Sequence, residues 1–227
     1  MKTMTSPARR WLTAIFFSLI SLCLSISPAQ ARRKHQPTAK APLPAPFVRS
    51  PVVRDFIQQM HEKHGFEVKP LQKIFEHARP IPAVQKAIMP PRDPSIRSWQ
   101  AYRSRFIEPH RLEGGERFWQ AHAATLNQTS AETGVPEEII VAIIGIESIY
   151  GRHMGNFGTL AALATLAFDY PKINPATDAA RAALFRQQLE ELLLLAREEG
   201  RDPLDYKGSY AGALGLPQFL PGSIRQY

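Results

Sequence analysis

Residues 136–151 read PEEIIVAIIGIESIYG, an apolar stretch that opens with a proline and two glutamates. Pro136 suits the first position of a helix, and Glu137 and Glu138 then lie at the positive end of the helix dipole, which favours acidic side chains. Nearly every residue from Ile139 to Ile149 is apolar. The pattern therefore predicts a helix that is buried on most of its sides.

Glu147 is the one ionisable residue within that apolar run. A solvated surface glutamate and a buried glutamate paired with an arginine are the two structural alternatives. The neighbours that share its helix face include Ile143, Ile144 and Tyr150, so we expect a carboxyl group removed from water, with a raised pKa. A protonated carboxylic acid is what the cleavage of a glycosidic bond requires. Glu147 is therefore our candidate general acid.

Residues 1–31 have the pattern of a secretory signal peptide. Lys2, Arg9 and Arg10 precede an apolar run over residues 11–24, and Ala29-Gln30-Ala31 is a small-x-small cleavage site. We favour cleavage after Ala31 over a retained anchor and over lipid attachment at Cys23, because Leu22 is larger than the usual residue before a lipidated cysteine. The remaining chain would have no cysteine, which excludes disulfides and thiol chemistry.

The net charge of +8 is concentrated at the beginning of the chain. Residues 1–46 carry seven lysines and arginines and no acidic residue, so the remainder is close to neutral. This distribution gives no support to nucleic-acid binding by the folded part. Residues 32–51 are rich in proline and basic side chains, which predicts an extended linker before a domain at 52–227.

Amphipathic spacing predicts several further helices and no convincing strand, so we expect a single mainly α domain of six or seven helices. The expected helices are 52–63, 71–78, 115–132, 160–168 and 178–199, and the prolines between residues 80 and 94 predict a connector. Residues 99–107 read WQAYRSRFI, which fits core packing with a basic edge. Aromatic faces and arginines also bind sugars, so Trp99, Tyr102 and Arg103 are candidate glycan contacts.

The last informative stretch is GSYAGALGLPQFLPGS at 208–223, where glycines allow close backbone approach and Ser209, Tyr210 and Gln218 supply polar groups. The histidines have no convincing metal-ligand spacing, and we expect no metal site. The next acid after Glu147 is Asp169. If Asp169 is not in the cleft, one carboxylate can still act: it protonates the leaving oxygen and then takes a proton from a hydroxyl of the same sugar, which attacks the anomeric carbon.

Several motifs in the expected order resemble the membrane-bound lytic transglycosylase B family (glycoside hydrolase family 103). They are FIQQMHEKHGF from residue 56, SWQAYRSRF, GVPEEIIVAIIGIESIYGRHMG, LAALATLAFDYP and GSYAGALGLPQFLPGSIRQY. The resemblance implies a lysozyme-like α fold, a periplasmic location, and non-hydrolytic cleavage of the MurNAc–GlcNAc β-1,4 bond in peptidoglycan to leave 1,6-anhydro-MurNAc ends. It places the catalytic glutamate at Glu147, a serine near the catalytic acid at Ser209, and glycan-binding residues at Gln218 and Tyr102.

Two departures from the family pattern affect these expectations. The family has a basic pair after its F-[DN]-Y-P motif, of which Arg181 alone is recovered here for recognition of the peptide stem. The family also continues beyond the position of Tyr227 with a calcium loop, so we expect an incomplete catalytic domain with no cofactor of its own. The alternatives are an inactive peptidoglycan-binding module and a hydrolytic muramidase that uses Asp169. We expect a monomer whose partners are peptidoglycan strands and, as further candidates, cell-wall synthesis enzymes.

Overall fold

The computed structural model describes residues 43–90 and 98–227, and this part of the chain is mainly α, as the sequence predicts. The expected signal peptide at 1–31 and the linker residues 32–42 lie outside the described residues. The expected linker is packed from Phe47 onward: this residue is 4% exposed, and its N–H donates to the carbonyl of Ala78 at 3.0 Å. The folded part therefore begins earlier than residue 52.

The first helices form where apolar residues recur on one face. The 3-10 helix η1 is Phe47–Arg49, followed by α1 (Pro51–His64), α2 (Val68–His77) and α3 (Pro82–Ile88). Helix α1 begins with a proline at its first position and ends at Gly65, whose φ of 69° is the left-handed conformation that glycine adopts readily. The connector expected over residues 80–94 is wrong in part, because Pro82 begins α3 instead of preventing a helix.

Helices α4 (Trp99–Arg103), α5 (Pro109–Ala121), α6 (Ala123–Thr133) and α7 (Glu137–Ser148) follow. The side chain of Glu108 caps α5 by accepting the backbone N–H groups of His110 and Arg111. The single helix expected over residues 115–132 is two helices, because His122 leaves the helical conformation, with φ −119° and ψ 19°. Helix α7 forms in the predicted stretch, but Pro136 is its N-cap and not its first residue, and the helix ends at Ser148 because Ile149 is left-handed.

The last part of the chain adds a small sheet to the helices. Its elements are β1 (Phe157–Gly158), α8 (Thr159–Phe168), α9 (Asp178–Glu198), the 3-10 helix η3 (Pro203–Asp205), β2 (Lys207–Gly208) and α10 (Pro221–Gln226). Strands β1 and β2 are antiparallel, with Phe157 opposite Gly208 and Gly158 opposite Lys207. The expectation of no strand therefore missed this sheet, which is too short for an alternating pattern to be visible in the sequence.

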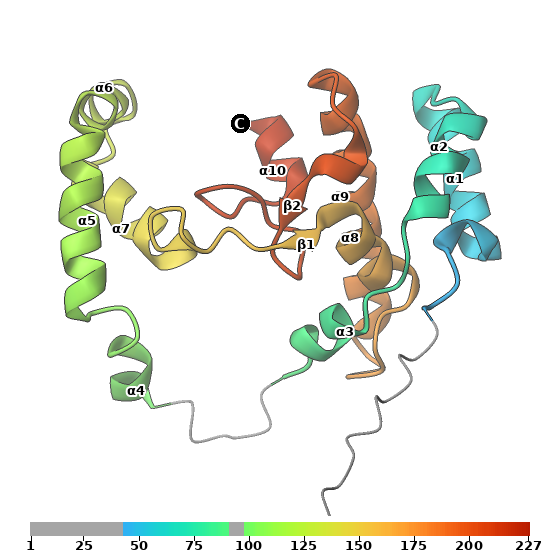
Figure 1. The fold of residues 1–227 in the computed structure, drawn as a ribbon, viewed down its shortest axis with the longest axis horizontal. Helices are drawn as coiled ribbons and strands as arrows, with labels where there is room; N and C mark the ends of the chain where they lie inside the picture. Colours follow the sequence, from blue (N-terminus) through green and yellow to red (C-terminus); the bar gives the residue numbers. More distant parts are fainter. Residues whose placement is uncertain (1–42, 91–97) are drawn as a thin grey trace, which may run out of the picture. The chain divides into compact units, whose positions relative to one another are not determined.

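The hydrophobic core is built by two parts of the chain. Helices α8 and α9 pack along each other (Figure 1), and residues of α1, α2 and α3 complete the cluster with Leu160, Leu163 and Leu189 among its fully buried members. The cluster takes its members from residues 47–88 and 157–224. None of the described residues between 98 and 156 belongs to it, so α4–α7 are held by contacts of their own.

Ion pairs join elements on the surface of the core. Glu190 of α9 accepts hydrogen bonds from Lys63 at 2.6 Å and His64 at 2.8 Å, both at the end of α1. Arg225 of α10 pairs with Glu191 and Glu198 of α9. Among the helices of the described segments, none has both the length and the apolar composition needed to cross a bilayer.

Candidate active site

Helix α7 packs through one face and exposes the opposite one. Its buried residues are Val141, Gly145 and Ser148, which recur at spacings of four and three and so share a face. Ile139, Ile143 and Ile146 recur in the same way on the other face and are 48%, 48% and 50% exposed. The prediction that this helix is buried on most sides is therefore wrong, because α5 and α6 cover only the first face.

Glu147 lies beside the exposed isoleucine face of α7 and is itself exposed. The expectation of a buried carboxyl group is thus wrong. No hydrogen bond or ion pair of this carboxylate is found within residues 43–90 and 98–227. An exposed carboxylate next to an apolar surface is open to a ligand from solvent, and a bound ligand would take it out of water.

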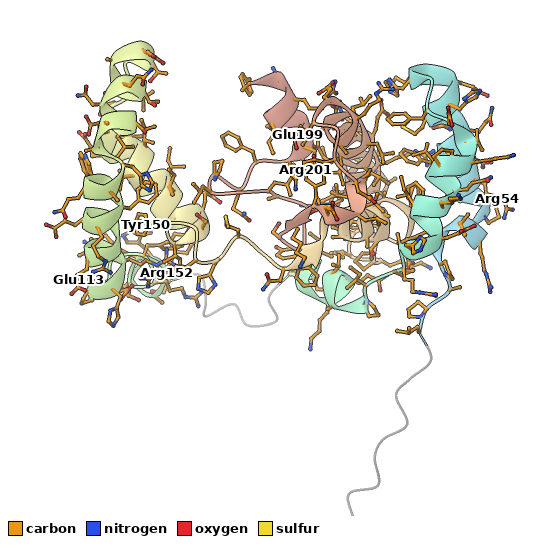
Figure 2. All side chains as sticks on the ribbon, turned by 45° about the horizontal axis from the view of Figure 1, so that its top comes forward. Arg54, Glu113, Tyr150, Arg152, Glu199 and Arg201 are labelled. Carbon is orange, nitrogen blue, oxygen red and sulfur yellow. The ribbon has the colours of Figure 1, made fainter. Side chains whose placement is uncertain are left out.

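The chain reverses sharply after Glu147. Ile149, Tyr150 and Gly151 have φ values of 51°, 56° and 85°, so three consecutive residues are left-handed. Left-handed backbone costs a residue other than glycine roughly 1–2 kcal/mol, and the β-branched Ile149 is especially unsuited to it. Figure 2 shows Tyr150 at this end of α7, next to α5. Such costs persist only where the surrounding contacts fix the conformation.

The ring of Tyr150 occupies a slot lined by glycines. A Cβ atom added at Gly145 of α7 or at Gly115 of α5 would lie 2.5 Å from the Tyr150 hydroxyl oxygen, and one added at Gly114 would lie 3.2 Å from the ring. The three glycines therefore provide the space in which the tyrosine joins the two helices. Phe118 of α5 also packs against this ring, with 5.5 Å between the centroids.

The residues after the reversal line a cleft of about 320 Å³ together with the glycine-rich segment near the end of the chain. The close approach of the two segments depends on Gly155, whose φ is 85° and where any Cβ atom would overlap the backbone of Gly208. The lining residues are Arg152, His153, Met154, Gly155, Asn156, Phe157, Ser209, Tyr210 and Gln218. The cleft thus contains Ser209 and Gln218, two of the predicted site residues.

Ser209 and Gln218 present complementary hydrogen-bonding groups at this cleft. The hydroxyl oxygen of Ser209 accepts the N–H groups of Ala211 at 3.3 Å and Ala213 at 3.0 Å, so its own proton remains to be donated. Nε2 of Gln218 donates to the carbonyls of Met154 at 3.2 Å and Gly215 at 2.8 Å, which leaves its Oε1 to accept. The hydroxyl and acetamido groups of an amino sugar bind both hydrogen-bond donors and hydrogen-bond acceptors, and the cleft offers one of each.

The other candidate residues lie elsewhere in the fold. Tyr102 of α4 is 50% exposed and stacks on Trp99, with 6.1 Å between the ring centroids. Arg181 of α9 lines a separate polar pocket with Tyr170 and Asp178. Asp169 follows α8, where its carbonyl accepts a hydrogen bond from Gln85 at 2.8 Å, and it does not line the cleft. The structure therefore brings Ser209 and Gln218 together. Glu147, Tyr102 and Arg181 are not among the residues that line this cleft.

Arg152 and His153 line the cleft but were not among the predicted site residues. Their signal in the sequence is their position, because they follow Glu147 by five and six residues in a glycine-containing loop. Figure 2 shows Arg152 at the end of α7 close to Tyr150. Both side chains are exposed, and they give this wall of the cleft a basic edge.

Known proteins resemble this chain in sequence and in structure. The family model of the transglycosylase SLT domain matches residues 49–227. The chain belongs to this family. It is 41% identical over 190 residues to membrane-bound lytic murein transglycosylase B of Escherichia coli strain K12, an alignment that covers 80% of the chain. The resemblance to the lytic transglycosylase B family is thereby confirmed.

Solved structures of the family share the fold. Soluble lytic transglycosylase SltB1 of Pseudomonas aeruginosa matches with a TM-score of 0.72 and 43% identity over 78% of this chain and 57% of that protein. SltB3 of the same organism, solved in complex with NAG-NAM-pentapeptide, matches with a TM-score of 0.64 and 29% identity over 78% of this chain and 44% of that protein. The lysozyme-like fold is thus confirmed. The chain spans about half the length of the curated relative, 50% of which is aligned.

Proposed function

We propose that the protein is a peptidoglycan lytic transglycosylase that cleaves the MurNAc–GlcNAc β-1,4 bond without water. The observation that carries the proposal is the convergence on one cleft of the loop that follows Glu147, of Ser209 and of Gln218. The relatives support it: the Escherichia coli protein is named a lytic murein transglycosylase, SltB1 is named a lytic transglycosylase, and SltB3 was solved with NAG-NAM-pentapeptide. Peptidoglycan strands are therefore the proposed substrate, and the periplasm is the proposed location.

In the proposed reaction Glu147 acts first as an acid and then as a base. Its carboxyl group protonates the glycosidic oxygen, and the bond from that oxygen to C1 of MurNAc breaks. The carboxylate then removes the proton from the C6 hydroxyl of the same sugar, whose oxygen attacks C1 and closes the 1,6-anhydro ring. The proton is returned to Glu147, and no water is consumed. Because the nucleophile belongs to the substrate, its effective concentration is high.

The roles of the other candidate residues follow from their positions. Ser209 donates and Gln218 accepts a hydrogen bond in the cleft, which fits the acetamido and hydroxyl groups of an amino sugar. The stacked pair of Trp99 and Tyr102 offers an apolar face to a sugar ring. Arg181 is proposed to meet a carboxylate of the peptide stem. This chemistry calls on no metal ion.

The test is mass spectrometry of the soluble products formed from purified peptidoglycan. We expect muropeptides that are one water lighter than hydrolytic products and that have no reducible end, and we expect Glu147→Gln to fold normally and to form none. The control is Glu138→Gln, since Glu138 is an exposed acid in the first turn of the same helix, away from the reversal that follows Glu147, and it should retain full turnover.

Two other results would contradict the proposal. Products with reducing ends would identify a muramidase that uses water, in which case a second carboxylate is required. Binding to peptidoglycan without any product, and with equal affinity for Glu147→Gln, would identify a glycan-binding module. The experiment includes the glycan-binding module as an outcome because Glu147 is exposed, so no residue of the described segments removes its carboxyl group from water.

A further inference from the structure

We propose that Ser148 is a positioning residue that fixes Glu147 relative to the wall of the cleft. The expected effect on the reaction rate rests on the proposed function, whereas the role of Ser148 in holding the loop does not. Ser148 directly follows Glu147 and is fully buried, with an exposed fraction of 0%. It is one of the few polar side chains that are buried in the described chain, so its hydroxyl group must have partners within the protein.

Both partners of the Ser148 hydroxyl group belong to the reversal of the chain. Its Oγ donates to the carbonyl of Ile144 at 3.2 Å, one turn back in α7, and accepts the N–H of Gly151 at 3.1 Å. The two left-handed residues Ile149 and Tyr150 lie between Ser148 and Gly151. The hydroxyl group therefore closes the loop formed by the residues whose conformation is intrinsically unfavourable.

The backbone of Ser148 holds the next part of the loop. Its carbonyl accepts the N–H of His153 at 2.8 Å, and the neighbouring carbonyl of Ile149 accepts that of Arg152 at 3.2 Å. Arg152 and His153 line the cleft. The side chain and backbone of one residue thus connect the end of the helix that carries Glu147 to the segment that forms one wall of the cleft.

Arg111 of α5 also holds the C-terminal end of α7. Its Nη1 donates to the carbonyl of Gly145 at 2.7 Å, a carbonyl in the last turn that has no further turn of helix to pair with. A cation at the C-terminal end of a helix is also favourable toward the helix dipole. Arg111 and the Tyr150 ring thus hold the end of α7 and the middle of the reversal, and the Ser148 hydroxyl group joins the end of the helix to the last residue of the reversal, Gly151.

A matched pair of variants separates positioning from ordinary helix capping. Thr133 ends α6 with the same two kinds of hydrogen bond: its Oγ1 donates to the Thr129 carbonyl at 2.7 Å and accepts the N–H of Val135 at 3.2 Å. It lies outside the cleft. Thr133 is exposed, so Thr133→Ala controls for the loss of a helix-terminal hydroxyl group alone, and Ser148→Thr restores the hydroxyl group in its buried position.

The first measurement is NMR on isotopically labelled protein, which needs no turnover. In Ser148→Ala we expect amide exchange of Gly151 and His153 to become more than tenfold faster and the carboxyl carbon resonance of Glu147 to shift, and we expect neither change in Thr133→Ala. Unchanged exchange at Gly151 or an unchanged Glu147 resonance would overturn the inference.

The second measurement is the kinetics of product formation. Ser148→Ala should lower kcat about ten- to a hundredfold at unchanged KM, since a displaced acid loses rate and not binding, and Ser148→Thr should recover most of it. A parallel loss in Thr133→Ala, or a rise of KM with unchanged kcat, would show that Ser148 has only a structural role. If the unmodified chain forms no product, the proposed function fails, and the NMR result still decides the inference.

Discussion

Glu147 shows what can and cannot be predicted for a single residue. Its place in the motif I-E-S-I-Y-G marked it as the candidate acid, and this role stays a prediction: the loop that follows it lines the cleft, whereas Glu147 itself is not among the lining residues. Its burial was mispredicted because α7 is apolar on all sides, so composition does not indicate which face has neighbours. That information lies in the packing of α5 and α6, which cover only the face of Val141 and Gly145.

Ser209 allows a prediction at the same scale. Ser209→Ala removes the acceptor of two backbone N–H groups and the one proton that is free to reach a ligand. We expect the affinity for a soluble muropeptide to fall about tenfold, the usual worth of one hydrogen bond. Isothermal titration calorimetry measures this loss, with Ser130→Ala of α6 as the control. Equal affinity in the two variants would mean that Ser209 only stabilises its loop.

At the scale of the element, helices were predicted best where one face is apolar and packed. Helices α1, α8 and α9 begin and end within a few residues of the expected bounds. The misses have local causes: Pro82 begins α3, and His122 separates α5 from α6. The slot for Tyr150 could not be predicted, because Gly114, Gly115 and Gly145 come together only when α5 packs on α7.

That slot predicts the effect of Gly145→Ala. Helix propensity alone favours alanine by about 1 kcal/mol, but the new methyl group would lie 2.5 Å from the Tyr150 hydroxyl oxygen. We expect the steric cost to exceed the gain in helix propensity, so that the free energy of local opening of α7 falls by about 1–3 kcal/mol. Amide exchange of the residues of α7 measures this change. Gly158→Ala is the control, because no atom lies within 4 Å of its added Cβ. Slower exchange in Gly145→Ala would contradict this explanation.

At the scale of the whole molecule, the ion pairs of α9 give stability a dependence on pH. Burial raises the pKa of the Glu190 carboxyl group, but hydrogen bonds from Lys63 and His64 lower it, and the net direction is below the ordinary value of 4.5. A carboxyl group whose pKa is lower in the folded state contributes stability above its unfolded pKa. This contribution is lost as pH falls through the lower, folded value.

We therefore expect the free energy of unfolding to fall between pH 6 and about pH 3, and to fall less in Glu190→Gln. Urea unfolding at several pH values measures the difference. Glu76→Gln changes an exposed acid of α2 and is the control, with an expected pH profile like that of the unmodified protein. An identical profile for Glu190→Gln would show that the contacts with Lys63 and His64 contribute no measurable stability. Many ion pairs near a protein surface contribute none.

The hydrophobic core takes no member from the described residues 98–156, although Glu147, Ser148 and the Tyr150 slot all lie in that part of the chain. Regions with few buried apolar contacts open locally at a lower free energy than the core does. A melting curve followed by circular dichroism is dominated by the large packed helices and therefore reports on α8 and α9. A mutational screen that selects for thermal tolerance would therefore not detect damage to α7, and an unaltered Tm would not show that this helix and the reversal after it are intact.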